Sequence, residues 1–148
     1  MSGIIVGIDS STHSHNALEW AVREAAIRHQ PLTVLTVEEV ATSGWHGTLV
    51  FPADHELEDR AQRAAQEIAD KAVQQFGEGA PESVTVRAVI GIPAAELVEA
   101  SRDADLLVVG SRGAGGFARL MIGSVSSQVS HHAHCPVVIV PDADSRAA

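Results

Sequence analysis

The amino-acid sequence predicts a single α/β domain, doubly wound around a five-stranded parallel sheet in the order 3-2-1-4-5, with helices on both faces. Short β-branched runs alternate with segments of helical periodicity along the chain. The runs are apolar throughout, which is typical of strands buried on both faces of a parallel sheet. Right-handed crossovers leave few topologies for such a sheet and favour this order. A chain of 148 residues with 45% hydrophobic residues suits one domain with a normal core.

The N-terminal segment predicts a strand, a helix and a second strand. Residues 3–8 (GIIVGI) form a β-branched run bounded by turn residues. After the polar stretch DSSTHSHN, apolar residues recur at spacings of three and four up to about residue 29 and predict a helix. Pro31 ends this helix, and residues 32–37 (LTVLTV) form the second strand. The expected inner stripe of the helix consists of Ala17, Leu18, Ala21, Val22 and Ala25.

A loop, a long helix and the third strand come next. Residues 38–52 have no clear period and contain glycines and a proline, so we expect a loop. Helical periodicity returns over residues 53–76 and stops at a cluster of glycine and proline. Residues 83–90 form the third strand. The expected inner face of the long helix consists of Leu57, Ala61, Ala64, Ile68, Ala72 and Phe76.

The closing part of the chain repeats the alternation. Residues 93–101 predict a short helix with proline in its first turn, and residues 105–109 (DLLVV) predict the fourth strand. A glycine-rich stretch leads into a helix over residues 124–133, and residues 137–140 (VVIV) form the last strand. We therefore expect one domain over residues 1–141 and a polar tail over residues 142–148.

Charge and composition exclude several classes of function. The formal net charge is −9 with one lysine, Lys71, whereas binding to nucleic acid requires clustered basic residues. The single Cys135 rules out an internal disulfide framework. The N-terminus does not resemble a secretory signal, and no apolar run is long enough for a transmembrane helix. We expect a cytoplasmic protein with neither nucleic acid nor membrane as a partner.

The glycine-rich stretch after the fourth strand reads GSRGAGGFARLMIGSVSS from residue 110 to residue 127. Glycine admits positive φ and lets N–H groups approach a phosphate without a Cβ in the way. Residues 123–126 open a helix, where N–H groups and the helix dipole favour an anion. The stretch therefore predicts a phosphate-binding loop. The simpler alternative is a surface turn in which Ser124 serves only as an N-cap.

Asp9 is the second candidate, because it follows the first strand at the point where the winding of the sheet reverses. A carboxylate at this position can accept hydrogen bonds from ribose hydroxyls. An N-cap or an Asx-turn before the first helix is the alternative for this aspartate.

Other motifs give weaker signals. Residues 113–118 (GAGGFA) fit the dinucleotide fingerprint but do not turn directly from strand to helix, and no P-loop lysine is present. His131, His132, His134 and Cys135 suggest a metal site, with three of them expected on one helix face. Their position at a helix end favours a contact with the helix dipole instead, and no fourth ligand is evident.

The spacing Gly110-x2-Gly113-x9-Gly123-Ser124 resembles the ATP-binding signature of the universal stress protein family. The segments IIVGIDSSTHSHNALEWAV, GIPAAELVEASRDADLLVVGSRG and HCPVVIVP also resemble the family, so that the resemblance covers nearly the whole chain. It implies a Rossmann-like fold of the adenine nucleotide alpha hydrolase type. Many members have glycine after the acidic residue, whereas Ser10 and Ser11 follow Asp9 here, which leaves the shape of that turn open.

The resemblance also implies the site. Asp9 would contact the ribose or the adenine side, Val37 would meet adenine through its backbone, and the glycine-rich loop would hold ribose and phosphates. The complete set of expected nucleotide-binding residues is Gly7, Asp9, Ser10, Val37, Val109, Gly110, Ser111, Arg112, Gly113, Gly123, Ser124, Val125 and Ser126.

The function expected from these observations is that of an ATP-binding module in a stress response, with Mg²⁺ on the phosphates as a further expectation. A slow Mg²⁺-dependent ATP hydrolase or a nucleotidyl-transfer enzyme is the alternative. Arg112 is the only obvious cation for such chemistry, and the sequence places no second catalytic group. A homodimer through residues 137–140 is expected, because an apolar edge strand is prone to aggregation unless it is covered.

Replacing Gly113 by valine should abolish ATP binding while the protein stays folded, because the new side chain blocks the approach of the phosphates without removing core packing. Isothermal titration with ATP measures the binding, and circular dichroism checks the fold. Unchanged ATP affinity in a folded Gly113→Val protein would contradict the phosphate-loop hypothesis.

Overall fold

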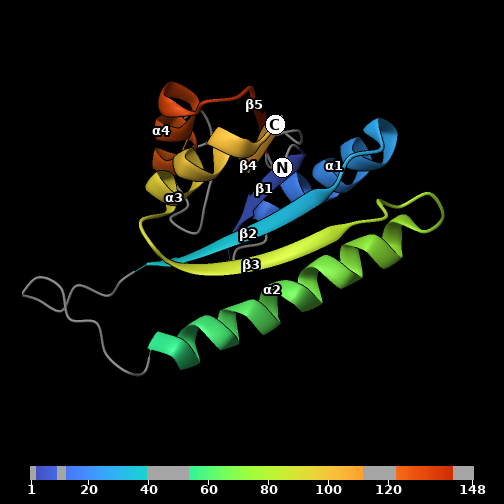
Figure 1. Ribbon diagram of the computed structural model, residues 1–148, viewed down its shortest axis with the longest axis horizontal. Coiled ribbons are helices and arrows are strands. Elements are labelled where there is room, and N and C mark those ends of the chain that lie inside the picture. Colours follow the sequence, from blue (N-terminus) through green and yellow to red (C-terminus); the bar gives the residue numbers. More distant parts are fainter. Residues whose placement is uncertain (1–2, 10–12, 40–53, 112–122, 142–148) are drawn as a thin grey trace, which may run out of the picture.

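Five parallel strands form one sheet in the order β3-β2-β1-β4-β5, which confirms the predicted topology (Figure 1). The structure is a computed structural model that describes residues 3–9, 13–39, 54–111 and 123–141. Its elements are β1 (Ile4–Ile8), α1 (His13–Arg28), β2 (Leu32–Glu39), α2 (Asp54–Phe76), β3 (Val84–Gly91), α3 (Pro93–Ala100), the 3₁₀ turn η1 (Ser101–Asp103), β4 (Leu106–Gly110), α4 (Ser124–His132) and β5 (Val137–Val140).

Helices cover both faces of the sheet. α1 and α2 pack on one face, and α3 and α4 pack together on the other (Figure 1). Alternate residues of each strand point to opposite faces, so Ile4 and Val6 of β1 join the core under α1 and α2, whereas Ile5 joins the core under α3 and α4. The continuous apolar runs in the sequence follow from this double coverage.

The inner stripe of α1 is as predicted, since all five of its residues are buried. The inner face predicted for α2 is partly wrong. Ala61, Ala65 and Ala69 are buried, whereas Ala64 is exposed and Leu57 is 38% exposed. Phe76, at the other end of the helix, is also 38% exposed. A row of alanines at spacing four lets α2 lie closer to the sheet than a row that contains the larger side chains.

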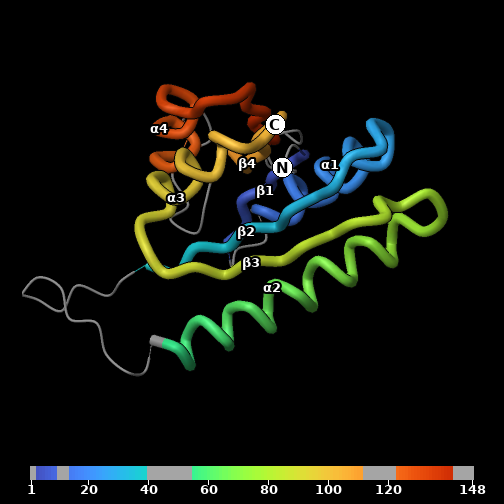
Figure 2. Tube along the Cα trace, in the orientation of Figure 1, coloured from blue at the N-terminus to red at the C-terminus, as the bar shows by residue number. Residues whose placement is uncertain are grey.

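Most element boundaries agree with the predicted ones to within about two residues, the usual uncertainty for element ends. β2 continues through Glu39, and α3 ends at Ala100 before the 3₁₀ turn. Figure 2 shows β2 and β3 as long neighbouring strands, with α2 running beside β3. The predicted loop after residue 39 and the predicted polar tail lie outside the described residues. Within the described ranges, no helix is both long enough and apolar enough to cross a bilayer.

Candidate functional site

The carboxyl ends of β1, β2 and β4 meet at one edge of the sheet. Ile8 pairs with Thr36 of β2, so Asp9, the next residue, is level with Val37. The register between β1 and β4, continued in the same way, brings Asp9 level with Ser111. Neighbouring strands in a sheet lie about 4.8 Å apart. The residues expected at the nucleoside end and the start of the glycine-rich stretch are therefore close neighbours.

Asp9, Val37 and Ser111 belong to the sheet face that α3 and α4 cover. Val37 packs against the apolar cluster of that face. Residues that are level in a parallel sheet share a face, so Asp9 and Ser111 are on this side as well. The site is thus on the side from which α4 starts.

Ser14, in the first turn of α1, fixes the main chain of Asp9. Its Oγ accepts a hydrogen bond from the Asp9 N–H at 3.3 Å and lies 3.1 Å from the Asp9 carbonyl oxygen, to which it donates. Ser14 is 4% exposed. The sequence did not single out this residue, because the stretch DSSTHSHN offers several hydroxyl groups of similar chemistry. The cap and Asx-turn alternatives for Asp9 involve residues 10–12, which lie outside the described part of the chain.

The end of β4 and the start of α4 are joined through the carbonyl oxygen of Ser111. Gly123 donates its N–H to this oxygen at 2.7 Å. The Ser126 Oγ lies 3.2 Å from the same oxygen and 3.1 Å from the Gly123 carbonyl oxygen, so its single proton is shared between two backbone acceptors. Ser111 also donates its N–H to the Val140 carbonyl oxygen at 2.9 Å. We call the hydrogen bonds among Ser111, Gly123 and Ser126 the loop clamp.

The side chain of Ser126 has a structural role in the clamp, since its hydroxyl binds backbone oxygens. Ser126 is 2% exposed and its Oγ faces the backbone, whereas the sequence led us to expect Ser126 among the nucleotide-binding residues. The backbone N–H of Ser126 lies in the first turn of α4, and its contact with a phosphate stays a prediction.

The first turn of α4 begins at Gly123. Gly123 is the N-cap, with φ −62° and ψ 160°, and among the described residues no side chain makes a capping hydrogen bond with the helix. The alternative role of Ser124 as the N-cap is therefore wrong, because Ser124 is the first helical residue and is exposed. N–H groups in the first turn of a helix have no acceptor within the helix and carry the positive end of its dipole. Ser124, Val125 and Ser126 present such groups.

Two of the expected residues lie beneath this edge and pack the core. A Cβ on Gly7 would lie 2.8 Å from Cδ2 of Leu97, so glycine lets α3 approach β1 closely. Val109 is 4% exposed and belongs to the apolar cluster under α3 and α4. Gly110 ends β4 beside Ser111. The expected ligands Ser10, Arg112 and Gly113 lie outside the described residues.

The histidines near the end of α4 do not share one helix face with Cys135. The helix ends at His132, so His134 and Cys135 lie beyond it. The N–H of His134 donates to the Oγ of buried Ser101 at 2.9 Å. Over the described ranges, no group of three or more histidine, cysteine or acidic residues could hold a metal ion.

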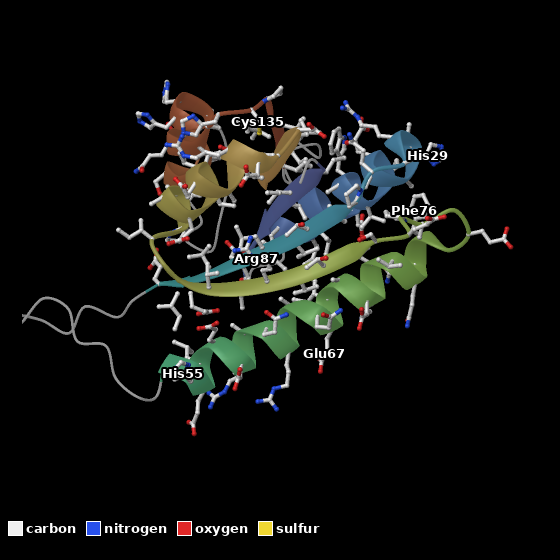
Figure 3. All side chains as sticks on the ribbon, in the orientation of Figure 1. His29, His55, Glu67, Phe76, Arg87 and Cys135 are labelled. Carbon is white, nitrogen blue, oxygen red and sulfur yellow. The ribbon has the colours of Figure 1, made fainter. Side chains whose placement is uncertain are left out.

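Cys135 lies between α4 and β5 (Figure 3). Burial raises the pKa of its thiol, and the nearby Asp105 carboxylate raises the pKa further, whereas a hydrogen bond with the backbone of Leu107 acts in the opposite direction. A raised pKa reduces the fraction of nucleophilic thiolate. This environment suits a packing role for Cys135.

A cavity of about 250 Å³ lies on the other side of the molecule, between α1 and α2. It is lined by Glu19, Val22, Arg23, Ala72, Gln75 and Phe76. None of the expected nucleotide-binding residues lines it, so we do not connect it with the site at the sheet edge.

Residues 1–141 match the model of the universal stress protein family. A universal stress protein of Mycobacterium tuberculosis is 40% identical over 154 residues, which cover 97% of this chain and 48% of that protein. The chain thus spans about half the length of the curated relatives it matches.

Solved structures agree with this match. UspA from Lactobacillus plantarum is 27% identical with a TM-score of 0.67, covering 95% of this chain and 97% of that chain. A universal stress protein in complex with cAMP is 28% identical with a TM-score of 0.65, covering 95% and 96%.

Replacing Ser126 by alanine should lower the free energy of unfolding by about 1 kcal/mol, the usual net value of one hydrogen bond. Ser124→Ala is the matched control and should change it by less than about 0.5 kcal/mol, because an exposed side chain without a capping bond contributes little. Urea denaturation followed by circular dichroism measures both. Equal losses in the two variants would contradict the assignment of the clamp to Ser126.

Proposed function

The chain belongs to the universal stress protein family, and from this premise we propose that it binds ATP and that ATP occupancy regulates its interactions in a cytoplasmic stress response. The observation that carries the proposal is the convergence of Asp9, Val37 and the N-terminus of α4 at one edge of the sheet. Ligands of open α/β sheets bind at this edge, where the winding reverses.

Each part of this edge suits one part of the nucleotide. The Asp9 carboxylate can accept hydrogen bonds from ribose hydroxyls, and the backbone of Val37 at the end of β2 can meet the adenine edge. Gly110 and Ser111 stand at the end of β4 on this edge, and Arg112 and Gly113, which follow them in the sequence, are the further residues that we propose for ribose and phosphates. The N–H groups at the start of α4 suit the phosphates themselves, with Mg²⁺ bound through them.

The electrostatics favour a backbone site. The chain carries a formal net charge of −9, so the field of the whole protein does not attract a polyphosphate. Oriented N–H groups at a helix start provide a local positive potential without any basic side chain. Support for an adenine nucleotide comes from the structural neighbour in complex with cAMP, which is 28% identical to this chain.

We further propose that the protein forms a homodimer through β5. This strand has β4 as its one neighbour in the described sheet. The Val140 carbonyl faces β4, where it accepts the Ser111 N–H. Because backbone groups of successive strand residues point to opposite sides, those of Val137 and Ile139 face away from β4. An apolar edge of this kind can pair with the same strand of a second copy.

Asp9→Ala should weaken the binding of ATP and of adenosine alike, by about 1.5 to 3 kcal/mol each, because the lost bonds are to a charged acceptor and involve the nucleoside. Isothermal titration measures both ligands. Asp59→Ala, an exposed carboxylate on α2, is the control for net charge. Loss of ATP binding with unchanged adenosine binding would show that Asp9 does not contact the nucleoside.

Ile139→Pro should convert the dimer to a monomer, because proline removes the outward N–H while the bonds between β4 and β5 remain. Ile139→Val keeps this donor and should stay dimeric. Size-exclusion chromatography with light scattering gives the molar mass, and circular dichroism checks the fold. A monomeric wild-type protein, or a folded Ile139→Pro protein that remains dimeric, would refute pairing through β5.

A further inference from the structure

The sheet has a second edge, formed by β3. Its residues 84–90 read VTVRAVI, with one charge and no proline. Segments of six or seven residues with high β-propensity, low charge and no proline are prone to add further strands. This edge is also longer than the other one, since β3 has eight residues and β5 has four. The β3 edge therefore presents the greater hazard of uncontrolled association.

Gln62 of α2 makes two hydrogen bonds with this edge. Its Nε2 donates to the Val86 carbonyl oxygen at 2.7 Å, and its Oε1 accepts the Ala88 N–H at 2.8 Å. In a parallel ladder, one residue donates to the residue before its partner and accepts from the residue after it. The side-chain amide of Gln62 thus makes the pair of bonds that a residue of an added parallel strand would make opposite Arg87, which is labelled in Figure 3.

The groups bound by Gln62 are those that face outward. Ser83, the residue just before β3, accepts the Leu32 N–H on the β2 side through its carbonyl oxygen. Because backbone groups of successive residues alternate in direction, those of Arg87 face β2, whereas those of Val86 and Ala88 face the free edge. Gln62 occupies the middle of the outward-facing row.

The position of Gln62 is set by the packing of α2. Ala61, Ala65 and Ala69 hold the helix against the sheet, and Figure 3 shows α2 running beside β3 from His55 to Phe76. Gln66, one turn further on, bonds to Asp70 on the exposed side of the same helix. An amide supplies both a donor and an acceptor, whereas an ionised glutamate supplies acceptors alone. Glutamine therefore fits this edge in a way that glutamate does not.

We propose that Gln62 closes the β3 edge against strand addition by a second copy of this chain, so that association of the sheet is restricted to the other edge. The closure of β3 stands on the two hydrogen bonds of Gln62 and does not depend on the proposed nucleotide. The restriction to β5 rests on the proposed dimer, which the experiment tests separately.

The test compares Gln62→Ala with Gln66→Ala in the full chain, because both variants remove a glutamine amide from α2. Hydrogen exchange of the Ala88 amide should accelerate roughly tenfold in Gln62→Ala, as expected for the loss of a protecting hydrogen bond. It should be unchanged in Gln66→Ala. Light scattering over a range of micromolar concentrations should give a molar mass above that of the wild-type protein for Gln62→Ala, and the wild-type molar mass for Gln66→Ala. Gln62→Glu is the second variant if the alanine protein does not fold.

The same comparison in the Ile139→Pro background separates the two edges. If β5 forms the dimer, Ile139→Pro is a monomer, and adding Gln62→Ala restores concentration-dependent association through β3. If Ile139→Pro leaves the dimer intact, the β5 proposal fails, but larger species in Gln62→Ala still support closure of β3. Faster exchange at Ala88 with an unchanged mass in both backgrounds would overturn the proposal and reduce Gln62 to a stabilising contact.

Discussion

The pairing of β1 with both β2 and β4 is the interaction on which the remaining structure depends. Ile4 and Val6 are fully buried between the two neighbouring strands and α1. A shift of β1 by one residue would turn these side chains to the other face, so the register is fixed by the core. Because the three strands are parallel, this register also fixes which residues meet at their carboxyl ends. Core packing therefore sets the position of the candidate site.

Small residues allow the helices to approach the sheet closely enough for polar contacts. Gly7 accommodates Leu97 of α3, and the alanine row of α2 lies against the opposite face. Close approach of α2 puts the amide of Gln62 within bonding distance of β3. At the other end of the chain, a short buried side chain, that of Ser126, joins α4 to β4. Small side chains thus allow both the close packing of the helices and the hydrogen bonds that depend on it.

The strand order could be predicted from the sequence because both faces of the sheet are buried, which leaves the strands as uninterrupted apolar runs. The meeting of Asp9 and Val37 followed from that order. The inner face of α2 could not be predicted in full, since rows that contain Leu57 or Ala65 satisfy helical periodicity nearly equally well, and contact with the sheet selects the smaller residues. The hydrogen bonds of Ser14 and Ser126 also could not be predicted from the sequence. Serine forms many local bonds, and the Ser111 acceptor of Ser126 is 15 positions away in sequence.

The loop clamp closes a ring in the chain, because Ser111 and Gly123, the residues on either side of 112–122, are hydrogen-bonded to each other. The entropy lost on closing such a ring increases only with the logarithm of its length. Insertions and deletions between Ser111 and Gly123 therefore change the free energy of folding little, and β4 and α4 keep their positions. The number and the identity of the residues between Ser111 and Gly123 can therefore change in evolution without altering how β4 and α4 pack in the domain.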